Sequence, residues 1–280
     1  MSGAMSDALH RLVRTPQGVL GIALLTVLAL ACLLGGVVAP YSPETIDFGG
    51  RFAAPGVRHW LGADQLGRDV LSRILVGAQS TVPLAAAATF CGAAAGAWVG
   101  TLSAYLGGRW DEAITRTIDA VMAVPHLLLA LILVSTLGKG SANAALAIAI
   151  SVVPGLARVT RSVALAARQQ DYVKAAIARG EGAAWIVLGE MLPNVVAPVI
   201  IEATIRVAFA VMLFATLSFL GLGAQPPASE WGLMVSEARR YMHQAPWLIV
   251  APALAIALTA ICFNLLGDGL RDALNPRDER

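Results

Sequence analysis

The sequence predicts an all-α, polytopic membrane protein with about six transmembrane helices. Of its 280 residues, 57% are hydrophobic and only 14% are charged, which is more apolar material than a soluble core of this size can bury. Apolar stretches of roughly the 20 residues that a bilayer-spanning helix needs cover residues 19–38, 82–106, 118–137, 143–159, 195–223 and 247–266. These stretches are too long, and lack the alternation, for a transmembrane β-barrel.

The first stretch is expected to be a retained helix rather than a secretory signal. It is longer than a usual signal core and leads into Pro40 and Tyr41 without a cleavage site. The second contains a run of small residues at 85–97, which allows close helix packing in lipid. Cys32, Cys91 and Cys262 lie in predicted spans without CxxC spacing, so neither a disulfide framework nor a cysteine metal site is expected.

The distribution of Lys and Arg predicts the orientation of the chain. We place residues 1–18, 107–117, 160–194 and 267–280 on one side of the membrane, where the basic residues are Arg11, Arg14, Arg109, Arg116, Arg161, Arg168, Lys174, Arg179, Arg271, Arg277 and Arg280. The other side carries Arg51, Arg58, Arg68, Arg73, Lys139, Arg239 and Arg240. The excess on the first side predicts that both termini are cytoplasmic. The net charge of +2, without a dense basic patch, argues against a nucleic-acid partner.

The segment 172–194, YVKAAIARGEGAAWIVLGEMLPN, lies between two apolar spans and carries most of the functional information. Helix formers at 164–179 are followed by the breakers Gly180 and Gly182, and then by a second helical run that should end at Pro193. We therefore expect a cytoplasmic helix–turn–helix. The small residues Ala175 and Ala176 would allow a partner to dock closely. The alternative is an amphipathic segment lying on the membrane surface.

A second informative segment, LGADQLGRDVLSR at 61–73, is expected outside the membrane. Gly62 and Gly67 predict turns, and residues 69–76 predict a short amphipathic helix. Four charged residues, Asp64, Arg68, Asp69 and Arg73, could pair with one another or contact a partner. Local pairing is favoured because mixed exposed charges are normally just solvated.

Ionisable residues in the spans have simple structural explanations. Glu202 and Arg206 are four residues apart and are expected to form a neutralising pair on one helix face, in preference to the alternative of a substrate contact. Asp119 is expected at the start of the third span, where the helix dipole favours a carboxylate. A metal-binding role for His126 is disfavoured. The chain has no GxSxG, HExxH or Walker A pattern, so we expect neither an enzyme nor an ATP site of its own.

Four ordered blocks carry a family resemblance. KAAIARG followed by LPN resembles the coupling signature of permease subunits of ABC importers. HWLGADQLGRDVLSRILVGAQ at 59–79, LSFLGLGAQPPASEWGLM at 217–234 and LGDGLRDALNPR at 266–277 resemble the peptide and nickel branch of that family. The chain is most similar to the DppC-type permease of dipeptide importers, with oligopeptide and nickel permeases as near neighbours.

The resemblance implies a type I ABC importer permease-like bundle in the bacterial cytoplasmic membrane. Residues 1–80 would hold a cytoplasmic segment, the first helix and the external loop. Residues 81–280 would form a five-helix core with a coupling segment at 160–194. The implied partners are a homologous, DppB-like permease, two cytoplasmic ABC ATPase subunits that bind ATP and Mg, and an extracytoplasmic substrate-binding protein. No cofactor or metal is implied for this chain.

The resemblance also assigns candidate residues to two sites. The ATPase-coupling residues would be Tyr172, Lys174, Ala175, Ala176, Gly180, Glu190, Leu192, Pro193 and Asn194. Those at the external gate or binding-protein contact would be Asp64, Gly67, Arg68, Asp69 and Arg73.

Three positions depart from the family pattern. Lys174 stands where relatives usually have glutamate, Glu190 where they commonly have histidine, and Phe214 where a glutamate is frequent. Lys174 and Glu190 could therefore meet across the turn, each could meet a residue of the ATPase, or both could be tolerated surface substitutions. The cargo also stays open: peptides lead by resemblance, with nickel or another small solute as alternatives. An ATP-independent channel or secondary carrier is the alternative from another class.

Overall fold

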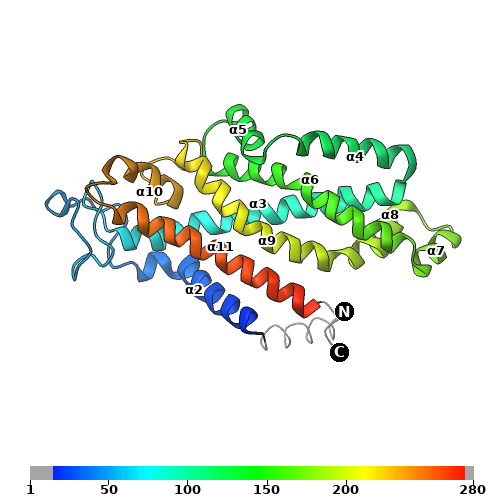
Figure 1. Cartoon of the computed structure of the whole chain (residues 1–280), viewed down its shortest axis with the longest axis horizontal. Helices are drawn as coiled ribbons and strands as arrows, with labels where there is room; N and C mark the ends of the chain where they lie inside the picture. Colours follow the sequence, from blue (N-terminus) through cyan, green and yellow to red (C-terminus); the bar gives the residue numbers. More distant parts are fainter. Residues whose placement is uncertain (1–14, 275–280) are drawn as a thin grey trace.

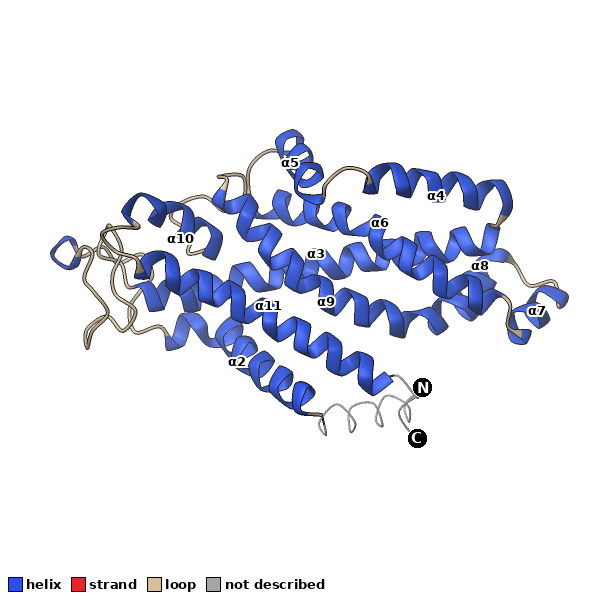
Figure 2. Ribbon diagram, in the orientation of Figure 1, coloured by secondary structure: helices blue, strands red, loops and turns tan. Residues whose placement is uncertain are grey.

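The computed structural model describes residues 15–274 as a bundle of long helices (Figure 1, Figure 2). Five of these helices are long and apolar enough to cross a membrane. They are α2 (Pro16–Val38), α3 (Val70–Leu106), α6 (Ser141–Arg168), α9 (Leu192–Phe219) and α11 (Trp247–Leu274). Residues 15–274 form no β-strand beyond an isolated bridge between Ala63 and Asp69. The all-α prediction is confirmed.

The third predicted span, at 118–137, is not one helix. It consists of α4 (Gly108–Met122) and α5 (His126–Leu137), which are bent by 89° relative to each other. Pro125 causes the break because it has no N–H to donate and keeps the residue before it out of the helical region. The count is therefore five spans, or six if the bent pair is one span.

The segment between α6 and α9 also differs from its predicted outline. After α6 ends at Arg168, α7 (Asp171–Ala178) forms a separate short helix, and α8 (Ala183–Trp185) follows the turn. A π-helical stretch, η2 (Ile186–Met191), then joins α8 directly to α9. The expectation that the second run ends at Pro193 is wrong, because this residue lies in the first turn of α9, where a missing N–H is tolerated.

The predicted short helix at 69–76 is the start of α3. Asp69 caps this helix, since its Oδ2 accepts a 2.8 Å hydrogen bond from the Ser72 N–H. The helix continues for 37 residues, so the proposed division at residue 80 falls inside it. Three shorter elements accompany the loops: η1 (Phe48–Gly50), α10 (Trp231–Ala238) and η3 (Arg239–Tyr241).

The bundle has two different ends (Figure 1). One, the loop end, carries residues 39–69 and α10. The opposite end, the α7 end, also holds the start of α2 and the end of α11. The described parts of the predicted cytoplasmic segments thus gather at the α7 end, and the predicted external loop lies at the other. Four of the basic residues used for orientation, Arg11, Arg14, Arg277 and Arg280, lie outside the described residues.

Glycines allow α3 and α6 to pack closely. A Cβ on Gly92 would lie 2.5 Å from the carbonyl oxygen of Ala149, and a Cβ on Gly100 would lie 2.4 Å from that of Ala157. Such distances leave no room for a side chain. The two backbones therefore touch in the way that small residues allow in membrane helices.

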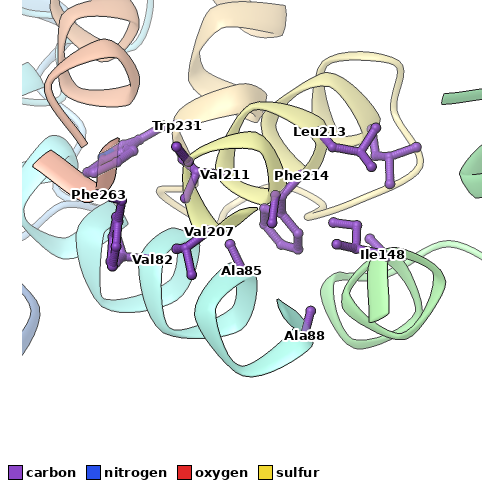
Figure 3. Close-up of a cluster of buried hydrophobic side chains, with 14 of the residues drawn as sticks. Val82, Ala85, Ala88, Ile148, Val207, Val211, Leu213, Phe214, Trp231 and Phe263 are labelled. Atoms are coloured by element: carbon purple, nitrogen blue, oxygen red, sulfur yellow. The ribbon is translucent and has the colours of Figure 1, made fainter. Parts of the chain in front are cut away.

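The main core lies where α3, α6 and α9 meet (Figure 3). Phe214 projects from α9 towards Ala88 of α3 and Ile148 of α6, and its side chain is fully buried. An aromatic residue thus fills the position at which the family resemblance suggested a glutamate. Trp231 and Phe263 extend the core towards α10 and α11.

Candidate functional site

The first candidate site is α7 with the turn that follows it. Val173 and Ala176 are fully buried and pack with residues of α3, α6, η2 and α9. The other face of α7 is open: Tyr172, Ala175 and Ile177 are exposed. The two candidate docking alanines therefore differ, because Ala175 is available to a partner whereas Ala176 holds α7 on its own bundle.

Arg179 connects the end of α7 to the turn and to η2. Its Nη2 lies 2.7 Å from Glu181 Oε1 and 3.8 Å from Glu190 Oε1. Gly180 adopts φ +76°, a left-handed conformation that favours glycine at a helix end. The sequence predicts the glycines as helix breakers, but it does not indicate the contacts that Arg179 makes.

Lys174 and Glu190 do not pair with each other. Lys174 Nζ lies 3.3 Å from Asp171 Oδ1 on its own helix, and Glu190 faces Arg179 instead. The hypothesis that these two residues meet across the turn is therefore wrong. Their side chains remain partly open to solvent, so a contact of each with an ATPase residue stays a prediction.

The end of the coupling segment belongs to the membrane bundle. Leu192 packs against both apolar clusters, whereas Pro193 and Asn194 are exposed on the first turn of α9. Asn194 Nδ2 donates a 2.7 Å hydrogen bond to the carbonyl oxygen of Glu190. Although Tyr172 is partly exposed, partial desolvation raises the pKa of its phenol, and the charge of Glu190 adds to this increase. The charge of Glu190 on η2 thus acts on Tyr172 of α7.

The second candidate site is a buried cluster of charges at the loop end. Asp64 Oδ2 accepts hydrogen bonds from Arg68 Nε at 2.6 Å and from Arg73 Nη1 at 2.8 Å. Glu237 of α10 also contacts both arginines, with Oε2 3.2 Å from Arg68 Nη2 and 3.2 Å from Arg73 Nη2. The expected local pairing is present, but the charges are buried rather than solvated.

Sequence reasoning missed Glu237. It is 164 residues from Arg73, and no local spacing signals a contact over that distance. The only available signal was the surplus of charge in the 61–73 segment. The cluster ties this segment to α10, so these two parts of the loop end are held together.

Two other candidate residues of this segment have structural roles. Asp69 takes no part in the cluster: besides capping α3, its Oδ1 lies 2.9 Å from Nδ1 of the buried His59. Gly67 has φ +78°, and a Cβ there would lie 1.8 Å from the carbonyl oxygen of Asp47. Only glycine fits at this position.

Glu230 is a further buried carboxyl group that sequence analysis did not single out. It caps α10 by accepting hydrogen bonds from the N–H groups of Gly232 at 3.0 Å and Leu233 at 2.9 Å. Burial raises its pKa, although these hydrogen bonds oppose the increase. The sequence signal for this cap is that an acidic residue, Glu230 itself, directly precedes the apolar run of α10.

The ionisable residues of the spans are paired as follows. Glu202 Oε1 lies 2.8 Å from Arg206 Nη2, as predicted. Asp119 is not at a helix start: it lies near the end of α4 and pairs with Arg158 of α6. The helix-dipole explanation is therefore wrong, and an interhelical ion pair replaces it. The His126 ring contacts Phe209, and residues 15–274 contain no group of three possible metal ligands.

Comparison with known proteins identifies the family. Residues 92–279 match the model described as binding-protein-dependent transport system inner membrane component. Residues 3–55 match the N-terminal TM domain of oligopeptide transport permease C. Similar curated proteins include the glutathione transport system permease protein GsiD of Escherichia coli O6:K15:H31 (strain 536 / UPEC) and of Shigella sonnei (strain Ss046). Each is 44% identical over 241 residues, covering 86% of this chain and 80% of the relative.

These matches and the apolar helices show a multi-pass protein of the inner membrane that is a transport component rather than an enzyme. The chain belongs to the family of binding-protein-dependent transport system inner membrane components, as a permease subunit of an ABC importer of the peptide and nickel type.

Proposed function

We propose that this permease subunit imports small peptides, with dipeptides and glutathione as the first cargoes to test. The family resemblance favours dipeptides, and the relatives described above carry the name of glutathione transport. The chain would form the translocation pathway with a homologous permease. Two cytoplasmic ATPases would bind ATP and Mg, and an external binding protein would deliver the cargo.

The observation that carries the ATP-driven part of this proposal is the geometry of α7. This helix projects at one end of the bundle (Figure 1), with one face anchored through Val173 and Ala176 and the other exposed. A lever between a motor and a membrane bundle needs both properties. A free face receives the motor, and a packed face passes the displacement to α6 and α9.

The switch of the bundle between its outward-open and inward-open states would then follow from nucleotide binding. ATP can shift the bundle between outward-open and inward-open states only if the ATPases bind nucleotide with different affinity in the two states. The tie between Arg179 and Glu190 would make α7 and the start of α9 move together. The site therefore supports a mechanical link and requires no chemistry in this chain.

Affinity co-purification of the tagged chain, co-expressed with its ATPases, tests the docking site. Ala175→Trp places a bulky group on the exposed face of α7, and Ala54→Trp is the matched control on the exposed loop at the opposite end. Loss of the ATPases from a still-inserted Ala175→Trp complex, with retention in Ala54→Trp, is expected. Equal recovery of the ATPases with both variants would remove α7 as the docking element.

Uptake by proteoliposomes tests the cargo. The assembled importer, supplied with binding protein, should take up a dipeptide or glutathione only when ATP is present on the ATPase side. Competition between the two peptides ranks them as cargo. Uptake that is independent of ATP would support the channel or carrier alternative instead.

A further inference from the structure

A polar hollow opens at the loop end, beside the buried charge cluster. Its volume is about 310 Å³, and three parts of the chain form its walls. Gln65 comes from the loop before α3, Ser236 and Glu237 come from α10, and Arg239, Arg240 and Tyr241 come from η3. None of these residues belongs to the coupling site.

The charges around this hollow do not cancel. Glu237 is already engaged by the two buried arginines, Arg68 and Arg73, and Asp64 balances the remaining charge of the cluster. Arg239 and Arg240 are exposed and form no ion pair with any residue in 15–274. The wall therefore presents two arginines whose charge is not neutralised.

Contacts with α9 and with the loop hold this wall of the hollow in place. The Arg239 guanidinium lies over the ring of Phe219, 5.8 Å from its centroid. Ser236 Oγ donates a 2.8 Å hydrogen bond to the carbonyl oxygen of Phe219, and the ring of Tyr241 packs against Phe52 at 4.9 Å. The end of α9, α10 and the loop are thus held together around the hollow.

We propose that this hollow binds the free carboxylate of the peptide cargo as it enters the pathway from the loop end. Guanidinium groups bind carboxylates through paired, charge-assisted hydrogen bonds, which makes arginine suited to this recognition. The proposal rests on the proposed import of small peptides, because unmodified dipeptides and glutathione both carry a free carboxylate. It adds a contact for the cargo on the permease itself.

Chemical protection tests the site without requiring transport. Phenylglyoxal modifies exposed arginines, and mass spectrometry of the assembled complex in nanodiscs measures the modification of each one. Alanyl-alanine should slow modification of Arg239 and Arg240, whereas alanyl-alanine amide, which lacks the carboxylate, should not. Arg58, an exposed arginine paired with Asp47 outside the hollow, provides the internal control and should react equally in all samples.

Uptake kinetics provide the second measurement. The double variant Arg239→Gln/Arg240→Gln should raise the KM for alanyl-alanine about tenfold, the scale of one lost charge-assisted interaction, with a much smaller change in kcat. Lysine at both positions should restore part of the affinity because it restores the charge. Arg58→Gln should keep the KM of the wild type.

The outcomes separate the carboxylate of the cargo from one on the binding protein. Protection that needs the binding protein and is the same for peptide and amide would overturn the proposal, because the bound carboxylate would then belong to that protein. Modification that is unchanged under every condition would also overturn it. Protection by alanyl-alanine in a complex that imports no peptide would support the site while refuting the proposed function.

Discussion

Arg73 shows how much of the loop end depends on one buried side chain. Its side chain is 2% exposed, and its guanidinium joins Asp64 to Glu237, so it connects the segment before α3 to α10. Arg73→Met fills much of the same volume but leaves buried carboxylates short of a partner. We expect a loss of about 3–5 kcal/mol in the free energy of unfolding, the usual cost of breaking a buried ion pair. Unfolding by SDS in mixed micelles measures it.

Arg58→Met is the matched control. Arg58 also pairs with an aspartate, Asp47, but the two side chains are 71% and 36% exposed. Exposed pairs contribute about 0–1 kcal/mol, so this variant should unfold almost as the wild type does. Equal losses in the two variants would show that the Arg73 cluster does not stabilise the fold through its burial.

Glu230 predicts a pH dependence with a definite sign. Burial raises its pKa above the ordinary value of 4.5, so the folded state binds the proton more tightly than the unfolded state. The contribution of Glu230 to stability is complete below pH 4.5 and is lost as the pH rises through the raised pKa. Glu230→Gln should therefore gain stability relative to the wild type as the pH increases. Parallel SDS unfolding of the two proteins from pH 4 to 8 tests this, and a difference that does not change with pH would contradict it.

Glycine-to-alanine substitution should have opposite effects inside and outside the seam between α3 and α6. At Gly100 an added Cβ would lie 2.4 Å from the carbonyl oxygen of Ala157. Gly100→Ala should force the helices apart and cost about 1–3 kcal/mol. At Gly36 of α2 the nearest atom would be 3.6 Å away, in the side chain of Gln79. Gly36→Ala should be neutral or stabilising by up to about 1 kcal/mol, because alanine favours the helix. Thermal unfolding in detergent compares them, and the reverse order would exclude the close-packed seam.

Long elements were predictable because hydropathy reports them directly. The apolar stretches identify α2, α3, α6, α9 and α11, since each must satisfy its own backbone hydrogen bonds in lipid. The ends of these helices were harder to predict. Hydropathy gives no signal where α3 begins in the polar segment after Asp69, or where a π-helical stretch runs into α9 just before Pro193. Capping and local geometry decide these boundaries.

The candidate sites were predictable in their location and only partly in their contacts. The glycines of the turn and the charges before α3 both indicated the correct segments. Which alanine of α7 faces the bundle depends on how this helix packs, and the link from Arg73 to Glu237 depends on the complete fold. The sequence pattern alone gives neither the orientation of α7 nor this long-range contact. The prediction for Asp119 was wrong for the same reason, because its partner Arg158 lies on another helix.

At the scale of the whole molecule, separate functions lie at separate ends. The coupling helix α7 lies at one end, and the buried charge cluster with the polar hollow lies at the other (Figure 1). Long helices connect them: α3 and α9 each pass from one end towards the other. A displacement of α7 therefore has a packed route, through α9, to the elements around the hollow.

This arrangement predicts that the two ends lie on opposite sides of the membrane. Lys174→Cys and Val57→Cys, each in a background without Cys32, Cys91 and Cys262, place a thiol at the α7 end or at the loop end. Both positions are open, with a side chain 63% exposed at Lys174 and a residue 98% exposed at Val57. The basic residues near α7 favour the cytoplasm. A membrane-impermeant maleimide should therefore label Val57→Cys in intact spheroplasts and Lys174→Cys only in inverted vesicles. Labelling of both thiols from the same side would refute this orientation, and with it the placement of α7 beside a cytoplasmic ATPase.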